Sequence, residues 1–297
     1  MRLCLGTVQF GLKYGVAGNT QPDLSSCVEM LEYVYQNGVN TFDTASAYGT
    51  AEEVLGEFIK RKGVKHSYIE IVSKTSPDLF KEENRGCWYS EAKKSVLESI
   101  KRLNIEYLDG FMLHNANIIY DEEVIEALDK LKKEGYVKKI GASVYKPDEA
   151  KKTFSYKDTD IIQIPYNIFD HRLDKDGFFK PQIIENKKIY ARSAFLQGLL
   201  LMQINAIPTY LSEAVPIVKH FDELCKEYGT TRELVAINFV KSNKNIDYLV
   251  FGVDNLEQLK EFIEIFNTDV DRTIIKQIAK EFTQISDNIL MPFLWNK

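Results

Sequence analysis

Short β-rich runs alternate with amphipathic helical patterns along the whole chain, and this alternation constrains the fold more than any other feature. The predicted strands are residues 3–6, 41–43, 69–73, 108–113, 139–142, 161–164, 189–191 and 248–251. The clearest helical patterns between them are residues 25–36, 51–62, 90–102, 122–134 and 211–228. Such alternation is typical of a parallel sheet whose strands are joined by crossover helices. Eight repeats predict a (β/α)8 TIM barrel, a fold of the α/β class.

No linker, low-complexity tract or change of composition divides the 297 residues, and single barrels of this size are common. We therefore expect one domain over residues 1–297. Gly38, Gly63, Gly135 and Gly229 each follow a helical pattern, where glycine readily takes the left-handed conformation that ends a helix. Two more helical patterns, 231–241 and 271–286, fall outside the eight repeats and predict two extra helices.

The composition limits the partners that we expect. The formal net charge is −5 and the lysines and arginines form no stripe, so nucleic-acid binding is not expected. The most apolar stretch, 194–211, contains glutamines, an asparagine and a proline, so no membrane span is expected. The four cysteines form no CxxC pair and no metal-like grouping with the four histidines, which predicts no metal site. Reduced cysteines and a first segment unlike a signal peptide predict a cytoplasmic protein.

Four side chains with complementary chemistry lie at the ends of predicted strands. Asp43 ends the second strand and Tyr48 comes five residues later, while Lys74 and His114 follow the third and fourth strands. Barrel enzymes place catalytic groups at the carboxyl ends of their strands, so we expect these four to converge. A phenol can protonate an alkoxide, and a nearby ammonium is expected to lower its pKa. Asp43 is expected to pair with the ammonium, and His114 to polarise a substrate carbonyl.

Each of these residues also fits an ordinary structural role. Taken alone, Asp43 suits a turn at a strand end, Lys74 a solvated surface and His114 a hydrogen-bonded core position. Tyr48 in a loop most often serves packing. An accidental occurrence of all four in this order, at these strand ends, is much harder to explain. The set therefore favours a site that reduces a carbonyl group.

The order of motifs resembles that of the aldo-keto reductases. In that family a segment FDTAxxYGxxE, here residues 42–52, is followed by a Ser-Lys strand end and then a Leu-His strand end. The resemblance covers nearly the whole chain, and its other parts are Gly6-Thr7, Phe10-Gly11, Gly141-Ala142-Ser143, Gln163, Tyr166-Asn167, Arg192-Ser193, Gln197-Gly198-Leu199-Leu200, Gly252 and Gln258. It implies a barrel enzyme that reduces an aldehyde or ketone with NADP(H), with Tyr48 as the general acid and without a metal.

The cofactor site is expected outside a Rossmann unit, because no GxGxxG motif follows the first strand. Barrels hold phosphate with the loops after strands seven and eight. Those loops carry small or polar residues, namely Ser193, Phe195, Gln197, Gly198, Gly252, Val253 and Asn255. The resemblance adds Gly6, Thr7, Arg192, Gln258 and Glu261 as cofactor contacts, and it assigns Ser143 and Gln163 to the nicotinamide carboxamide.

Three positions depart from the family pattern. Val144 stands where many members have Asn, Arg192 where many have an aromatic that stacks on the nicotinamide, and Phe262 where many have an Asn at the adenine. Arg192 is expected to stack through its guanidinium plane, or else to form an ion pair at the mouth. Because 252–258 contains two acids and no Lys or Arg, we expect NADPH to be preferred over NADH by less than about a hundredfold, so that NAD(H) is a second cofactor.

Other functions remain open at this stage. The family also resembles the potassium-channel β subunits, so a cofactor-binding regulatory subunit is the main alternative. A barrel isomerase or aldolase is another, and it requires Lys74 as a Schiff-base amine. Residues 5–15 and 192–201 resemble a bacterial subgroup often associated with sugar or surface-polysaccharide pathways, which makes a sugar-like carbonyl one candidate substrate. The apolar tail, 291–295, is expected either to border that substrate or to pack on outer helices. The oligomeric state is left open.

Overall fold

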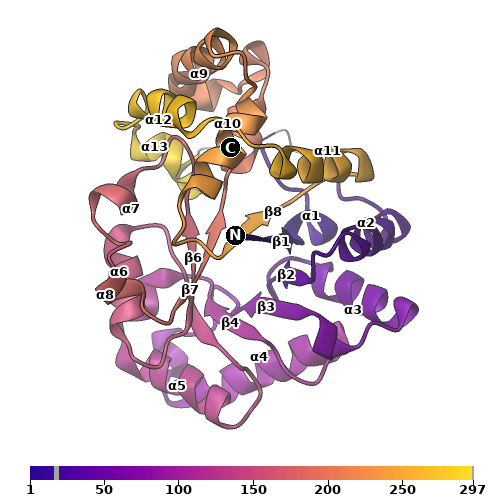
Figure 1. Cartoon of the computed structure of the whole chain (residues 1–297). Coiled ribbons are helices and arrows are strands. Elements are labelled where there is room, and N and C mark those ends of the chain that lie inside the picture. The colour runs from indigo at the N-terminus through magenta and orange to yellow at the C-terminus, as the bar shows by residue number, and fades with distance from the viewer. Residues whose placement is uncertain (17–19, 296–297) are drawn as a thin grey trace.

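Eight parallel strands close into a barrel in the computed structural model, which describes residues 1–16 and 20–295. Each strand pairs with its neighbour in the sequence, and β8 pairs with β1 (Figure 1). The strands are β1 Arg2–Gly6, β2 Thr41–Asp43, β3 Glu70–Lys74, β4 Gly110–Leu113, β5 Ile140–Ser143, β6 Ile161–Pro165, β7 Lys188–Arg192 and β8 Tyr248–Phe251. All eight predicted strands are confirmed, because each end lies within two residues of its prediction.

Helices surround the barrel (Figure 1). They are α1 Val8–Gly11, α2 Leu24–Gln36, α3 Ala51–Lys62, α4 Trp88–Leu103, α5 Glu122–Lys133, α6 Pro147–Ser155, α7 Arg172–Lys175, α8 Pro181–Ile184, α9 Val215–Glu227 and α11 Leu256–Asn267. Gly63, the C-cap of α3, has a left-handed φ of 62°, and the other three predicted cap glycines also have positive φ. Within the described part of the chain, no helix is both long and apolar enough to cross a membrane.

Both extra helices are present, as α10 Arg232–Ser242 before β8 and α12 Arg272–Lys280 after α11. Together with α9 and the short α13 Asp287–Leu290 they form a group at one side of the barrel (Figure 1). The second prediction, 271–286, was too long. Ser286 caps the amino terminus of α13 by accepting from the backbone N–H of Asn288. Helix α12 therefore ends before Ser286, at Lys280.

The helix predicted over 211–228 also begins later than expected. Residues Thr209–Ala214 form a 3-10 helix in which Leu211 has non-helical φ and ψ angles. The α-helix starts at Val215, next to Pro216 in its first turn. Proline suits the first turn of a helix because its missing N–H leaves no intrahelical bond unmade.

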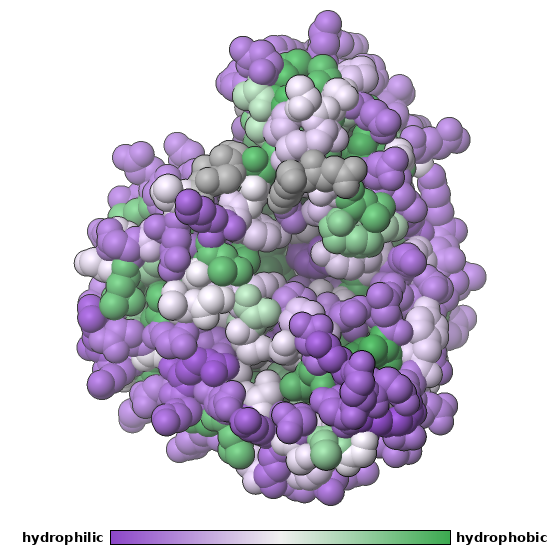
Figure 2. Space-filling view, turned by 180° about the vertical axis from the view of Figure 1, so that it is seen from behind, coloured by the Kyte–Doolittle hydropathy of each residue, from purple (hydrophilic) through white to green (hydrophobic). Residues whose placement is uncertain are grey.

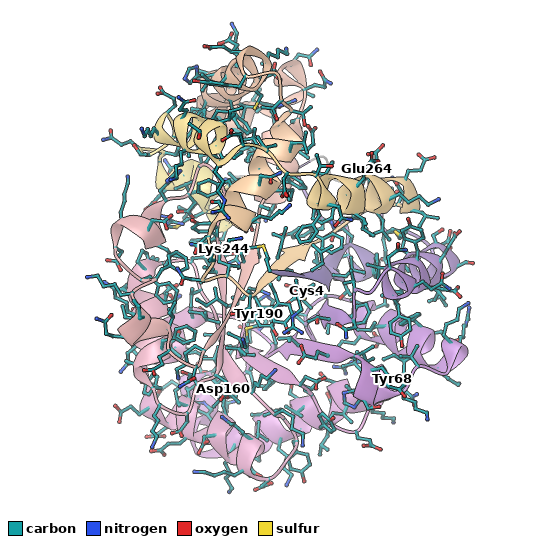
Figure 3. The ribbon with its side chains drawn as sticks, viewed as in Figure 1. Cys4, Tyr68, Asp160, Tyr190, Lys244 and Glu264 are labelled. Carbon is teal, nitrogen blue, oxygen red and sulfur yellow. The ribbon has the colours of Figure 1, made fainter. Side chains whose placement is uncertain are left out.

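The barrel interior is filled by side chains of the strands. A separate apolar cluster there consists of Cys4, Val72, Met112, Ile161, Tyr190, Tyr248 and Val250. Figure 3 labels Cys4 and Tyr190 near the centre of the ring of strands. The rings of Tyr190 and Tyr248 stack with centroids 4.4 Å apart. The interior is thus a packed core that closes the barrel from below, and functional groups are left to its rim.

Candidate active site

A cavity of about 430 Å³ lies at the carboxyl ends of the strands. Figure 2 shows a hollow near the centre of the molecule, seen from the side opposite to Figure 1. The cavity is lined by residues of the loops after β1, β2, β7 and β8, and by the first turns of α10 and α11: among them Val8, Gln9, Tyr14, Asp43, Tyr48, Gln163, Arg192, Gln197, Glu233, Gly252, Asp254 and Glu261. A cavity of this size and position is where a barrel binds its ligands.

The loop that carries Tyr48 is fixed by two glycines. A Cβ on Gly11 of α1 would lie 1.7 Å from the carbonyl oxygen of Tyr48, and one on Gly49 would lie 2.3 Å from the carbonyl oxygen of Gly11. Gly49 also has a φ of 54°, which favours glycine. The Phe-Gly and Tyr-Gly pairs of the sequence therefore serve one close backbone contact, which sets the direction of the Tyr48 side chain.

Three of the predicted catalytic groups are in direct contact. The Lys74 Nζ donates to Asp43 Oδ1 at 2.6 Å, to the carbonyl oxygen of Thr44 at 3.1 Å and to the Tyr48 hydroxyl at 3.4 Å. Lys74 and Asp43 are almost fully buried, and a buried charge needs such a partner. The ammonium is thereby engaged on three sides, an arrangement that does not favour a free Schiff-base amine.

The pKa of Tyr48 shows how these charges balance. Burial raises the pKa of Tyr48 well above its usual value, and the carboxylate of Asp43 raises it further, while Arg192 lowers it. The sequence-based expectation of a lowered pKa was therefore wrong. The main physical reason is burial, which disfavours the charged phenolate, and the carboxylate of Asp43 beside the Lys74 ammonium adds to the rise in pKa.

His114 completes the group beside Tyr48. The two rings meet edge to face, with centroids 5.6 Å apart. Burial lowers the pKa of His114 to about 4, and the charges of Lys74 and Arg192 act in the same direction. The imidazole is therefore neutral at pH 7. Its Nδ1 is buried without a hydrogen-bond partner among the described residues.

A chain of hydrogen bonds links the catalytic group to the ends of β5 and β6. The Gln163 Nε2 donates to Asp43 Oδ1 at 2.6 Å, and the Gln163 Oε1 accepts from the Ser143 hydroxyl at 3.2 Å. Asp43 Oδ1 thus accepts from both Lys74 and Gln163. Gln163 lines the cavity, whereas Ser143 lies behind it as a partner of that amide.

The loop after β7 has unusual backbone geometry. Ser193, Leu196 and Gln197 have φ angles of 62°, 48° and 55°, and Gly198 follows with 94°. Positive φ is rare for residues other than glycine and concentrates at functional sites. The Gln197 carbonyl oxygen accepts from the backbone N–H of Val16, so the loop after β1 meets this loop at the edge of the cavity.

The loop after β8 presents the first turn of α11 to the cavity. Asn255 does not line it but caps the helix, because its side chain accepts from the backbone N–H of Gln258. The Gln258 side chain in turn accepts from the backbone N–H of Asp254. Acidic side chains predominate at this end, where Glu233, Asp254 and Glu261 line the cavity.

Arg192 ends β7 and reaches across β6 toward β5. Its Nη2 donates to the carbonyl oxygen of Val144 at 2.9 Å, and its Nη1 donates to the Ser193 hydroxyl at 3.3 Å. The guanidinium carbon lies 4.2 Å from the centre of the Tyr145 ring. Of the two roles expected from the sequence, the ion pair is not seen, since no carboxylate of the described residues lies within ion-pair distance of Arg192.

The structure thus brings most of the sequence-predicted site residues together. Those that line the cavity are Gly6, Asp43, Tyr48, Gln163, Arg192, Ser193, Phe195, Gln197, Gly198, Gly252, Val253, Gln258 and Glu261, and Phe262 lies with them. Lys74 and His114 contact Tyr48 from behind. Thr7 is buried and donates to the carbonyl oxygen of Asp43, so it supports the site from outside the cavity.

Sequence reasoning missed Gln9, Tyr14 and Glu233, which line the cavity, and Tyr145, which contacts Arg192. The Gln9 Oε1 is buried without a partner among the described residues, and a Cβ on Gly252 would lie 2.4 Å from it. The short stretch around Gln9 and Tyr14 carried a signal, because it belongs to the segment 5–15 that resembles the aldo-keto reductase opening. No sequence signal pointed to Glu233 or Tyr145.

The comparisons with known proteins agree with this geometry. The model of the Aldo/keto reductase family matches residues 2–281. The chain is 25% identical over 312 residues to the NADH-specific methylglyoxal reductase of Escherichia coli strain K12, which covers 94% of each chain. It is 23% identical over 286 residues to a probable voltage-gated potassium channel subunit beta of Arabidopsis thaliana, which covers 87% of each chain.

A solved structure confirms the fold. The holo form of aldo-keto reductase AKR11C1 from Bacillus halodurans superposes with a TM-score of 0.76. The two sequences are 21% identical, and the match covers 96% of this chain and 93% of the other.

Proposed function

The chain belongs to the aldo/keto reductase family and is an NAD(P)-dependent oxidoreductase, and from that premise we propose that Tyr48 is the general acid with which it reduces an aldehyde or ketone to the alcohol. The observation that carries this proposal is the Lys74 ammonium, which contacts both Asp43 Oδ1 at 2.6 Å and the Tyr48 hydroxyl at 3.4 Å. A buried phenol held in this way is placed at the wall of the cavity.

The residues around the cavity fit a nicotinamide dinucleotide. Gln9 Oε1 has no partner among the described residues, and Gly252 lies close to it. Together they leave a polar surface at the β8 end of the cavity. The positive φ angles of Ser193 and of the run from Leu196 to Gly198 turn backbone groups of the β7 loop in a way that suits phosphate. We infer that Ser193, Gln197, Gly252 and the first turn of α11 hold the cofactor. When bound, NAD(P)H supplies the hydride that reduces the carbonyl carbon.

Tyr48 supplies the proton. Its raised pKa keeps the hydroxyl protonated at neutral pH, and a developing alkoxide is a stronger base than a phenolate. The proton therefore moves to the substrate oxygen only as negative charge forms there. Lys74 then faces the new phenolate at hydrogen-bond distance and stabilises it. Asp43 holds the ammonium in place before and after that transfer.

His114 orients the substrate oxygen. The imidazole is neutral, since its pKa is lowered to about 4. Of the two tautomers of the neutral ring, we propose the one with its proton on Nε2. In that form Nε2–H can donate to the carbonyl oxygen, next to the Tyr48 hydroxyl. Two donors then share the oxygen on which negative charge develops.

The test is a substrate panel. Purified protein is mixed with NADPH or NADH and with simple aldehydes, ketoaldehydes or reducing sugars, and the loss of reduced-cofactor absorbance is followed. We expect turnover of at least one carbonyl class. We also expect NADP(H) to raise the melting temperature in the presence of a chelator, because a ligand that binds the folded state stabilises it. Absence of both effects at millimolar cofactor contradicts the proposal.

A second candidate function has one observation in its favour. The similarity to the protein described as a probable potassium channel subunit beta extends over 87% of the chain. A regulatory subunit of that kind binds the cofactor without needing turnover. The two candidates are separated by the panel, because a regulatory subunit shows the melting-temperature shift but no consumption of NADPH or NADH with any carbonyl.

Three finer proposals accompany this function. A sugar-like carbonyl is proposed as a substrate on the resemblance of residues 5–15 and 192–201 to the polysaccharide-pathway subgroup. Residues 1–297 are proposed to act as one domain, since α12 packs on α9 and α10. A cytoplasmic location is proposed because Cys4, Cys27, Cys87 and Cys225 are all free thiols.

A further inference from the structure

Arg192 places an unbalanced positive charge in the catalytic part of the cavity. The other nearby cation, Lys74, is neutralised by Asp43 at 2.6 Å. Arg192 has only neutral acceptors, the Val144 carbonyl oxygen and the Ser193 hydroxyl. A guanidinium has five N–H donors, and these two bonds use two of them. The remaining donors belong to a cation that has no carboxylate partner within the described residues.

The direction of the Arg192 side chain determines which ligand its charge can contact. The guanidinium contacts Val144 and Tyr145, which follow β5. It is thus turned toward the ends of β5 and β6 and away from the first turn of α11, where Glu261 and Asp254 line the cavity. The charge faces the half of the cavity that Tyr48 lines, and it lowers the pKa of Tyr48 and of His114 behind it, against and along with the effect of burial respectively. It is not placed for a phosphate near α11.

Aromatic side chains lie near the Arg192 guanidinium. It lies over the Tyr145 ring, and Phe293 of the tail packs edge to face on that same tyrosine, with centroids 4.7 Å apart. Tyr14 lines the same cavity; burial raises the pKa of its hydroxyl, and Arg192 lies close enough to lower it in part. The tail therefore supports this wall, rather than only packing on outer helices.

We propose that Arg192 is a specificity-determining residue that binds a carboxylate on the substrate, so that the enzyme reduces carbonyl compounds that also carry a carboxylic acid. The inference rests on the proposed carbonyl reduction. Among the described residues that line the cavity, Arg192 is the one cation, which matches a monoanion, and a phosphate dianion would remain half balanced. The planar donor edge of arginine also suits the two oxygens of a carboxylate.

The experiment compares matched substrates. 3-Carboxybenzaldehyde and 4-carboxybenzaldehyde are each assayed against their neutral methyl esters, with wild-type protein, Arg192→Gln, Arg192→Lys and a surface control, Arg61→Gln. Arg61 lies in an exposed i,i+4 pair with Glu57, so the control changes the net charge equally. The readout is the ratio of kcat/KM for acid and ester, which cancels effects on the cofactor and on the shared chemistry.

We expect Arg192→Gln to lower the acid-to-ester ratio by roughly ten- to a hundredfold, as for one charge-assisted hydrogen bond, whatever loss the acid and the ester share. Arg192→Lys keeps part of the ratio, and Arg61→Gln keeps all of it. An equal loss for acid and ester in Arg192→Gln overturns the inference, because the residue then acts through the cofactor or the fold. The inference is also overturned if the acid-to-ester ratio of the wild type is no higher than the ratio of Arg192→Gln.

Failure of the proposed function is recognised separately. If the wild type reduces neither acid nor ester, carbonyl reduction of these substrates is contradicted, and the melting-temperature shift that each compound causes still tests Arg192. A larger shift with the acid than with the ester, lost in Arg192→Gln but kept in Arg61→Gln, supports the carboxylate site. Equal shifts in the wild type contradict it.

Discussion

At the ends of β2, β3 and β4 the cavity is built from charged and aromatic side chains that bond to one another, whereas after β7 and β8 it is built largely from backbone in special conformations. The first region depends on the buried Asp43–Lys74 pair and its contact with Tyr48. The second depends on positive φ angles at Ser193 and Gln197 and on the capped start of α11. The difference predicts that the proposed chemistry and the proposed cofactor binding can be changed independently of each other.

The two regions also differ in what a substitution removes. On the strand-end side, one change removes a proton donor or leaves a buried charge without its partner, which costs about 3 to 5 kcal/mol. On the loop side, backbone N–H groups remain whatever side chain is present, so single substitutions are expected to have smaller effects. The following changes test whether the separation holds.

The largest effect is expected from Tyr48→Phe. Loss of the hydroxyl removes the proton donor but no atom of the cofactor loops, so kcat should fall by at least about a hundredfold while the dissociation constant for NADPH stays nearly the same. Tyr210→Phe, at an exposed position, is the matched control. Steady-state kinetics and fluorescence titration measure the two quantities. Retained turnover would remove Tyr48 from its role, and weakened cofactor binding would break the separation of the two regions.

Lys74→Met should lower kcat nearly as much and should also destabilise the fold. It leaves Asp43 buried without its cation, so the free energy of unfolding should fall by about 3 to 5 kcal/mol in denaturant titrations. The double change Asp43→Asn with Lys74→Met should recover part of that stability and none of the activity. Lys62→Met, which breaks a half-exposed pair with Glu32, should cost less than about 1 kcal/mol. Equal costs for the two lysines would contradict this account.

His114 should make stability depend on acid pH. Its pKa is lowered from 6.5 to about 4, so as pH falls the unfolded chain binds the proton first. The stability that the neutral ring provides is complete above about pH 6.5 and is lost as pH falls toward 4. Between pH 7.5 and 4.5 the wild type should therefore lose about 2 to 3 kcal/mol more than His114→Gln. Parallel urea titrations of both proteins check this, and identical pH profiles would show that the ring is not desolvated.

The smallest effect is expected on the loop side, in the choice of cofactor. No Lys or Arg lies in 252–258, and Glu233, Asp254 and Glu261 line that end of the cavity. The 2′-phosphate of NADPH therefore gains one charge-assisted bond at most, and the preference for NADPH over NADH in kcat/KM should stay below about a hundredfold. Rates with both cofactors on one accepted aldehyde decide it. A preference above about a thousandfold would mean that a basic residue such as Lys260 reaches the phosphate.

Much of the molecule could be predicted from its sequence because the relevant signals are local. Alternating apolar runs and helical patterns specified eight strands to within two residues. The proposed catalytic residues could be picked out for the same reason, since a strand end is a local feature and the barrel brings strand ends together. Helix boundaries near Ser286 and Pro216 were less accurate, because they depend on which of several capping arrangements the chain adopts.

The sequence by itself determined the order of the strands and the set of side chains at their carboxyl ends. Only the tertiary structure decided how their charges balance. Burial and the carboxylate of Asp43 raise the pKa of Tyr48 rather than lowering it, and Arg192 has no carboxylate partner among the hydrogen bonds of the described chain. The physical reason is that electrostatic energy depends on distance and burial between residues far apart in the sequence, and these are known only once the barrel has closed.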